Sequence, residues 1–172
     1  MAKRENFKAE EHVQSEFEEN VICINRSAKV VKGGKNFSFG ALVVVGNRNG
    51  RVGYGYGKAN EVSDAIRKGT DAAKRAMKKV VVVNDTIPHE MYSEFGGAKI
   101  VLKPAASGTG LVASAKVRSV LEAAGVSNVI AKSLGSSNAA NVVKATMQAM
   151  LDMRTADQVL SARGKKKKDS SI

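Results

Sequence analysis

The sequence predicts an α+β protein built from two successive blocks, each combining antiparallel strands with an amphipathic helix. Two observations carry this prediction. Segments in which apolar residues alternate with polar residues or glycine, as in strands, occur in both halves of the 172-residue chain. Longer segments with apolar residues at helical spacing follow them. The length is sufficient for one moderate core or two small ones.

The first block is expected over residues 21–84. Apolar residues 21–31 supply its first strand. Residues 37–45 supply the second, because apolar side chains alternate along one face of it. This strand ends at a turn that contains Asn49 and Gly50, a pair that supplies the positive φ of a tight hairpin.

The strand after the turn has two unlike faces. Val52, Tyr54 and Tyr56 form an apolar and aromatic face, whereas glycine occupies positions 53, 55 and 57 on the other. A face without side chains admits another backbone at close range. The pattern alone leaves two candidates open, a packed helix and a sugar-phosphate chain. For the tyrosines, core packing is favoured over stacking on bases.

An amphipathic helix is expected next, from Val62 to Val80. Its basic residues surround an apolar side that is rich in small residues, which predicts tight packing on the three strands. The apolar side holds Val62, Ala65, Ile66, Gly69, Ala73, Ala76, Met77 and Val80.

The second block is expected over residues 85–155. Its predicted elements are a hairpin of residues 88–95 and 98–104, a helix after Gly110 with Gly125 as C-cap, a strand over residues 128–135 and a helix capped by Asn138. Met147 and Met150 lie at core spacing in the last helix. Lys116 and Arg118 lie off the core face near the start of the first helix. Cations there oppose the helix dipole, which suggests a partner.

The two ends of the chain differ in charge. Residues 1–20 hold six glutamates and three basic residues, and they could include a short helix. The pattern fades from residue 156, and residues 165–168 are all lysine, so residues 156–172 are expected to form a flexible basic tail.

The net charge of +12 is concentrated in the first block, where residues 21–60 contain no acidic residue. A solvated surface normally mixes both signs. One sign over forty residues predicts a polyanionic partner, because clustered cations neutralise phosphates and release counterions. The seven cations are Arg26, Lys29, Lys32, Lys35, Arg48, Arg51 and Lys58.

Several other functions find no support in the sequence. No apolar run approaches the ~20 residues of a membrane helix. Gly108 to Ala113 match a dinucleotide fingerprint, but the acidic residue expected about 20 positions later is missing. Cys23 is the only cysteine, so no intrachain disulfide can form, and core packing is its expected role. No zinc site, catalytic residue or cofactor site is predicted.

Several segments of the chain resemble the family of bacterial small-subunit ribosomal protein five, in order over about residues 21–155. They include VVKGGK at residues 30–35, NGRVG at 49–53, GYGKA at 55–59, GTG at 108–110 and AKSLGS at 131–136. The resemblance implies a double-stranded-RNA-binding-like first domain and a second domain with a left-handed βαβ unit. That handedness runs against the usual rule and could not be deduced from composition.

The resemblance also implies the function and the partners. The chain would be a structural, non-enzymatic component of the small ribosomal subunit in the cytoplasm, monomeric within the ribosome. It would bind 16S rRNA, contact ribosomal proteins four and eight, and support assembly and decoding accuracy near the point where messenger RNA enters. An architectural DNA-binding protein is the alternative.

The residues expected at these interfaces follow from the basic segments and the matched motifs. The rRNA-binding candidates are Arg26, Lys29, Lys32, Gly33, Gly34, Lys35, Arg48, Asn49, Arg51, Gly53, Gly55, Tyr56 and Lys58. The resemblance places Gly108, Gly110 and Arg118 beside ribosomal protein four.

Overall fold

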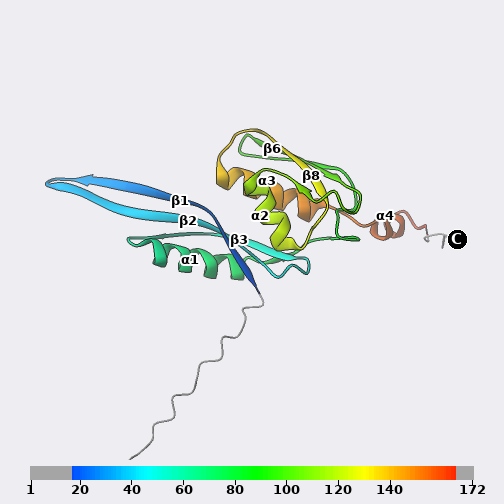
Figure 1. Cartoon of the computed structure of the whole chain (residues 1–172), viewed down its shortest axis with the longest axis horizontal. Helices are drawn as coiled ribbons and strands as arrows, with labels where there is room; N and C mark the ends of the chain where they lie inside the picture. The colour runs from blue at the N-terminus through cyan, green and yellow to red at the C-terminus, as the bar shows by residue number, and fades with distance from the viewer. Residues whose placement is uncertain (1–16, 166–172) are drawn as a thin grey trace, which may run out of the picture.

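The computed structural model describes residues 17–165 as two sheets and four helices (Figure 1). In chain order the elements are β1 (Glu18–Val31), β2 (Gly34–Gly46), β3 (Arg51–Ala59), α1 (Val62–Arg75), β4 (Lys78–Lys79), β5 (Met91–Phe95), β6 (Ala98–Pro104), β7 (Leu111–Val112), α2 (Ala115–Ala124), β8 (Val129–Gly135), α3 (Ala139–Asp152) and α4 (Ala156–Ala162). The α+β class predicted from the sequence is confirmed.

The elements form four layers. The first sheet has the strand order β1-β2-β3-β4 and is antiparallel, and α1 covers one of its faces. The second sheet has the order β5-β6-β8-β7, in which β7 and β8 are parallel. Helices α2 and α3 lie between the two sheets (Figure 1). The parallel pair and α2 supply a βαβ unit, whose left hand stays a prediction.

Strand β2 is buried on both faces, although the sequence predicted an apolar pattern on one. Ala41, Val43 and Val45 pack against α1. Leu42 and Val44 point the other way and join the core of the second block. The sequence is apolar at each of these five positions, which is the pattern of a strand covered on both sides.

The bare face of β3 packs on α1. Gly53, Gly55 and Gly57 are buried, and a methyl group added at each would meet a backbone carbonyl of the helix, those of Ala73, Gly69 and Ala65 respectively. Two strand residues span about 6.7 Å and four helical residues about 6.0 Å, so consecutive glycines meet consecutive turns. The helix therefore occupies the bare face of the strand, and the expected contact of Gly53 and Gly55 with rRNA stays a prediction.

Helix α1 ends at Arg75, before the predicted end at Val80. The chain then forms β4, which pairs with Arg51 and Val52 of β3. Val80 is buried and donates its N–H to the carbonyl of Gly50 at 2.8 Å. The basic pair in β4 therefore extends the sheet instead of the helix.

The start of the first block also differs from the prediction. Strand β1 begins at Glu18, so the last part of the expected acidic extension is strand, and residues 1–16 lie outside the described residues. Glu18 accepts two hydrogen bonds from the guanidinium of Arg48, at 2.6 and 2.9 Å, and Glu19 pairs with Lys74 at 2.8 Å. The hydrogen bond from Arg48 lowers the pKa of the Glu18 carboxyl.

The second block follows the predicted order. Gly96 and Gly97, both at positive φ, close the β5–β6 hairpin, and Gly125 at φ +88° ends α2. Asn138 caps α3, with its side chain accepting from the N–H of Ala140. Met147 and Met150 are buried as predicted, and Cys23 is half-buried beside the same core.

Two elements in the second half of the chain were not predicted. The short strand β7 lies between Gly110 and α2, so the helix begins at Ala115. Helix α4 occupies residues 156–162, where the pattern was expected to fade. Thr155 and Gln158 form a capping box there, which the sequence TADQ could have indicated.

The two blocks are joined by backbone hydrogen bonds as well as by a shared core. The N–H groups of Arg48 and Gly50, in the β2–β3 turn, donate to the carbonyls of Ala123 and Ala124 at 3.0 Å each. Arg48 has φ +54°. Gly125 lies so close to the Arg48 carbonyl that an added methyl group would collide with it. The turn therefore fits against the C-terminal end of α2.

Gly55→Ala should destabilise the protein by about 1–3 kcal/mol or more, because the new methyl group would push α1 away from β3. Urea unfolding measures the change. Gly34→Ala is the matched control, since nothing lies within 4 Å of a methyl group there and its φ is not positive. Equal stability of the two variants would contradict the close contact between strand and helix.

The Glu18–Arg48 pair predicts a pH dependence. Because the folded-state pKa of Glu18 is lowered, its contribution to stability is present above the unfolded pKa of about 4.3 and is lost as the pH falls through the folded value. Stability curves of the protein and of Glu18→Gln, measured against pH, should therefore converge in acid. Added salt should reduce the difference in stability between the protein and Glu18→Gln, since the ion pair is solvent-exposed. Curves that stay parallel down to the acid limit would argue against the pair.

Candidate nucleic-acid interface

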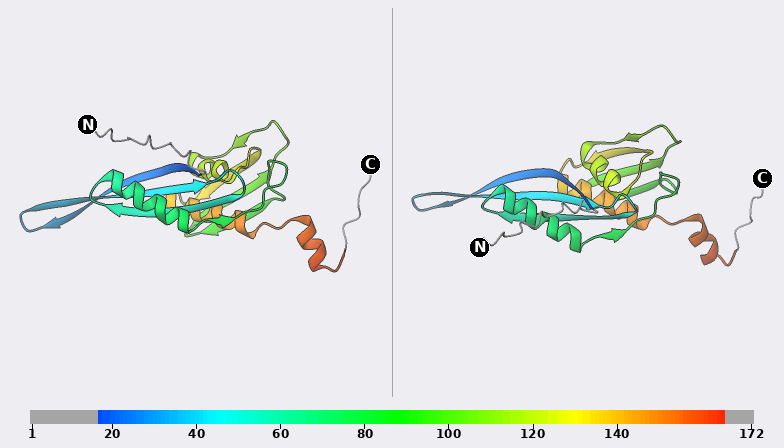
Figure 2. Two further views of the ribbon diagram at one scale, coloured as in Figure 1. Left: turned by 90° about the horizontal axis from the view of Figure 1, so that it is seen from below. Right: turned by 60° about the horizontal axis from the view of Figure 1, so that its bottom comes forward.

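The β1–β2 hairpin extends well beyond α1 and the rest of the molecule (Figures 1 and 2). Its strands are paired in continuous register from Cys23 opposite Leu42 to Val31 opposite Gly34. Gly33, at φ +95°, allows the tight turn at the tip. The tip reaches solvent, where Val30 is 72% exposed and Phe37 is 44% exposed.

The hairpin is a cationic arm. Arg26, Lys29, Lys32 and Lys35 are exposed, and none of them forms an ion pair with any of residues 17–165. The guanidinium of Arg26 lies 4.1 Å from the centre of the Phe37 ring, which orients the side chain without neutralising it. These charges are therefore available to a polyanion.

The two faces of the hairpin differ chemically. Residues that pair across the strands share a face, so Ser27 with Ser38 and Lys29 with Asn36 form a polar face. The opposite face carries Arg26, Phe37 and Val30 with their partners. Phosphates and ribose hydroxyls suit the polar face, and bases or apolar groups suit the other.

The remaining basic candidates do not gather at the arm. Arg48, Asn49 and Arg51 lie at the far end of β2, about 40 Å along the strand from the tip. Arg48 is already paired with Glu18 and serves the contact between the blocks. Arg51 instead neighbours β4, whose two lysines are exposed. Those lysines form a second cationic patch with Arg51 that the prediction missed, because they were assigned to the helix.

Strand β3 presents two further candidates on the face opposite the glycines. Tyr56 is 56% exposed, and Lys58 is exposed two residues later. The ring of Tyr56 lies over Gly40, where an added methyl group would meet its hydroxyl. Tyr54, on the same face, is half-buried and packs against the core, as predicted.

The candidate protein interface is an exposed loop with a fixed backbone. Gly108 and Gly110 have φ of +90° and +73°, and their N–H groups both donate to Oδ1 of the buried Asn128 at 3.1 Å. Arg118 donates to the carbonyls of Leu111 and Ala113 at 3.4 and 3.3 Å. The structure thus brings the three predicted residues into one region.

The cations near the start of α2 have acceptors within the chain. Besides the two bonds of Arg118, the ammonium of Lys116 donates to the carbonyl of Ser137. These carbonyls offset the unfavourable placement near the helix N-terminus. Both cations thus have acceptors within the chain, while Arg118 remains exposed and its contact with a partner stays a prediction.

Residues 17–165 contain no group of three or more histidine, cysteine, aspartate or glutamate side chains arranged to hold a metal. In that same region no helix is long and apolar enough to span a membrane. The segment that matched the dinucleotide fingerprint is a loop followed by β7, so its glycines do not open a helix.

Comparison with known proteins gives consistent matches over nearly the whole chain. The family described as "Ribosomal protein S5, N-terminal domain" matches residues 17–81, and "Ribosomal protein S5, C-terminal domain" matches residues 93–163. Small ribosomal subunit protein uS5 of Syntrophobacter fumaroxidans is 52% identical over 155 residues, which cover 90% of this chain and 93% of that protein. Its counterpart in Treponema denticola is 49% identical over 164 residues, which cover 95% and 92%. The chain therefore belongs to the bacterial-type uS5 family of small-subunit ribosomal proteins.

Proposed function

We propose that the β1–β2 hairpin binds 16S rRNA and holds the two domains in place on the small ribosomal subunit. As a member of the uS5 family, the chain is a structural, non-enzymatic constituent of that subunit in the cytoplasm. The observation that carries the proposal is the projecting arm with four cations that have no acidic partner in the described part of the chain. Folded RNA offers the phosphate density that such an arm requires.

The arm is suited to RNA in its shape as well as its charge. A two-stranded ribbon with small polar side chains on one face can follow a groove or the junction between helices, where ribose hydroxyls and phosphates are displayed. The second cationic patch, around Arg51 and β4, adds a contact at the opposite end of the sheet. A long RNA with several helices could engage both ends at once. The alternative of an architectural DNA-binding protein has no support in the comparisons.

The finer partners are part of the proposal. The chain acts as a monomer within the ribosome, contacts ribosomal proteins four and eight, and supports decoding accuracy near the point where messenger RNA enters. The fixed loop of Gly108 and Gly110, together with the exposed Arg118, supports a protein contact on this side of the second domain.

Replacing Lys29, Lys32 and Lys35 with alanine should weaken 16S rRNA binding and flatten its salt dependence. Each lost phosphate contact reduces the slope of log K against log salt by about 0.7–0.9, so three contacts reduce it by about 2–3. The matched control replaces Lys99, Lys103 and Lys132, which are exposed lysines of the second sheet, and so makes the same change in net charge. Filter binding to 16S rRNA and to duplex DNA, at equal salt, measures both. Equal slopes for the two triple variants would exclude the arm as the main contact.

Arg118→Glu should leave rRNA binding intact, weaken the contact with ribosomal protein four and raise misreading in reconstituted ribosomes. Arg118→Gln is the control for local structure, because an amide can still donate to the carbonyls of Leu111 and Ala113. If charge is what the partner senses, the glutamate variant should misread more than the glutamine variant. Wild-type accuracy in both would remove Arg118 from the interface.

A further inference from the structure

Two hollows are each lined by one residue of β3 and by residues of α3. The first has a volume of about 450 Å³, and the second about 380 Å³. Tyr54 lines the first and Tyr56 the second, so each hollow has one tyrosine of β3 in its wall. Residues of α3 line the opposite wall of both. We call this space the β3–α3 cleft.

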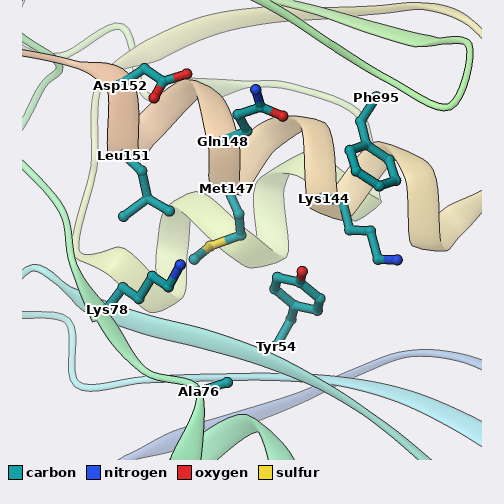
Figure 3. Close-up of a pocket in the computed structure, with 9 residues that line it drawn as sticks. All are labelled: Tyr54, Ala76, Lys78, Phe95, Lys144, Met147, Gln148, Leu151 and Asp152. Carbon is teal, nitrogen blue, oxygen red and sulfur yellow. The ribbon is translucent and has the colours of Figure 1, made fainter.

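The two tyrosines are spaced for neighbouring bases. They lie two residues apart on the same face of β3, so their positions along the strand differ by about 6.7 Å. Figure 3 shows Tyr54 rising from β3 toward α3, where Met147 faces it. A pair of aromatic residues on adjacent same-face positions of a sheet is a known platform for stacking successive bases.

The cleft has neutral walls that carry three lysines. Lys78 and Lys144 line the first hollow, and Lys116 lines the second. Lys144 lies 5.0 Å from the centre of the Phe95 ring, and the ammonium of Lys116 donates to a backbone carbonyl, so within residues 17–165 neither lysine is paired with a carboxylate. Of the described residues that line the two hollows, Asp152 alone is acidic.

Polar groups in the cleft are available for recognition. Within residues 17–165, neither tyrosine hydroxyl accepts or donates a hydrogen bond, and the amide of Gln148 and the ammonium of Lys78 also have no protein partner there. An apolar floor with a few convergent polar groups is the usual composition of a ligand site. Aromatic platforms with surrounding lysines select an unpaired nucleic-acid strand over an apolar peptide.

We infer that the β3–α3 cleft binds a single-stranded segment of RNA, with one base stacked on Tyr56 and the next on Tyr54, and with lysines beside the phosphates. This inference rests on the proposed rRNA binding and adds a second, separate mode of contact. The hairpin would bind through the RNA backbone, whereas the cleft would read unpaired bases. A protein segment as the occupant is an outcome that the experiments below distinguish.

Tyrosine emission gives a direct test, because the chain has no tryptophan and three tyrosines. A six-residue oligoadenylate should quench the emission of the full chain and bind more tightly than a duplex RNA of equal length. Tyr56→Leu should weaken oligoadenylate binding about 5- to 150-fold, and Tyr56→Phe should retain it, since stacking needs the ring alone. Tyr92→Leu is the matched control, because Tyr92 is 53% exposed on β5, away from the cleft.

Alanine at Lys29, Lys32 and Lys35 should leave oligoadenylate binding within twofold, because these residues lie outside the cleft. The experiment therefore distinguishes an absence of RNA binding in the cleft from an absence of RNA binding by the hairpin. Equal affinity of Tyr56→Leu and Tyr92→Leu for oligoadenylate would overturn the inference, while leaving the hairpin proposal standing.

Probing in the assembled subunit identifies the occupant. A variant with Cys23→Ala and Gln148→Cys carries its single thiol at the mouth of the first hollow. An iron chelate attached there should cleave an unpaired segment of 16S rRNA in reconstituted subunits. Cleavage limited to paired rRNA, or crosslinks from the same thiol to a neighbouring protein alone, would overturn the inference.

Discussion

Strand β2 is buried on both of its faces, and both hydrophobic cores of the molecule are built against it. Five consecutive apolar side chains, residues 41–45, have α1 on one side and the core of the second domain on the other. Each fully buried valine contributes about 1.5–3 kcal/mol, so neither covering layer can be removed without a large cost. An isolated two-stranded hairpin is only marginally stable, but here the base of the hairpin is packed between these two layers. The exposed arm is thus an extension of the best-packed strand in the molecule.

This arrangement separates binding from stability. The cations of the arm and the exposed Val30 and Phe37 lie beyond the clamped part of the sheet, so they contribute little to either core. Surface charges of one sign repel one another, and a molecule that keeps them in a narrow projection limits that repulsion in its body. By contrast, Glu18 and Glu19 at the start of β1 form ion pairs with Arg48 and Lys74. The positive charge available to RNA therefore depends on where the basic residues lie as well as on how many there are.

The sequence predicted the class of fold and most elements because turn and cap chemistry is local. Gly96-Gly97, Gly125 and Asn138 each end or begin an element through their own backbone or side chain, and each lies where it was expected. The misses depend on distant contacts. Val80 has the spacing of a helical residue but bonds Gly50, thirty residues earlier, and β4 forms as a result. The glycine face could not be assigned from the sequence, because a helix and a sugar-phosphate backbone require the same absence of side chains. The pairing of Arg48 with Glu18 also required the folded chain.

The glycine face of β3 also fixes where α1 can sit along the sheet. On that face the three glycines are flanked by Arg51 and Ala59, which both carry a β-carbon. If α1 slid by one turn in either direction, one of its carbonyls would come to rest on a side chain instead of a glycine. The three glycines thus allow only one register between β3 and α1, in which each glycine contacts one of three successive helical turns. The glycine run therefore specifies the position of α1 along the axis of the strand, which no single contact between two side chains could specify.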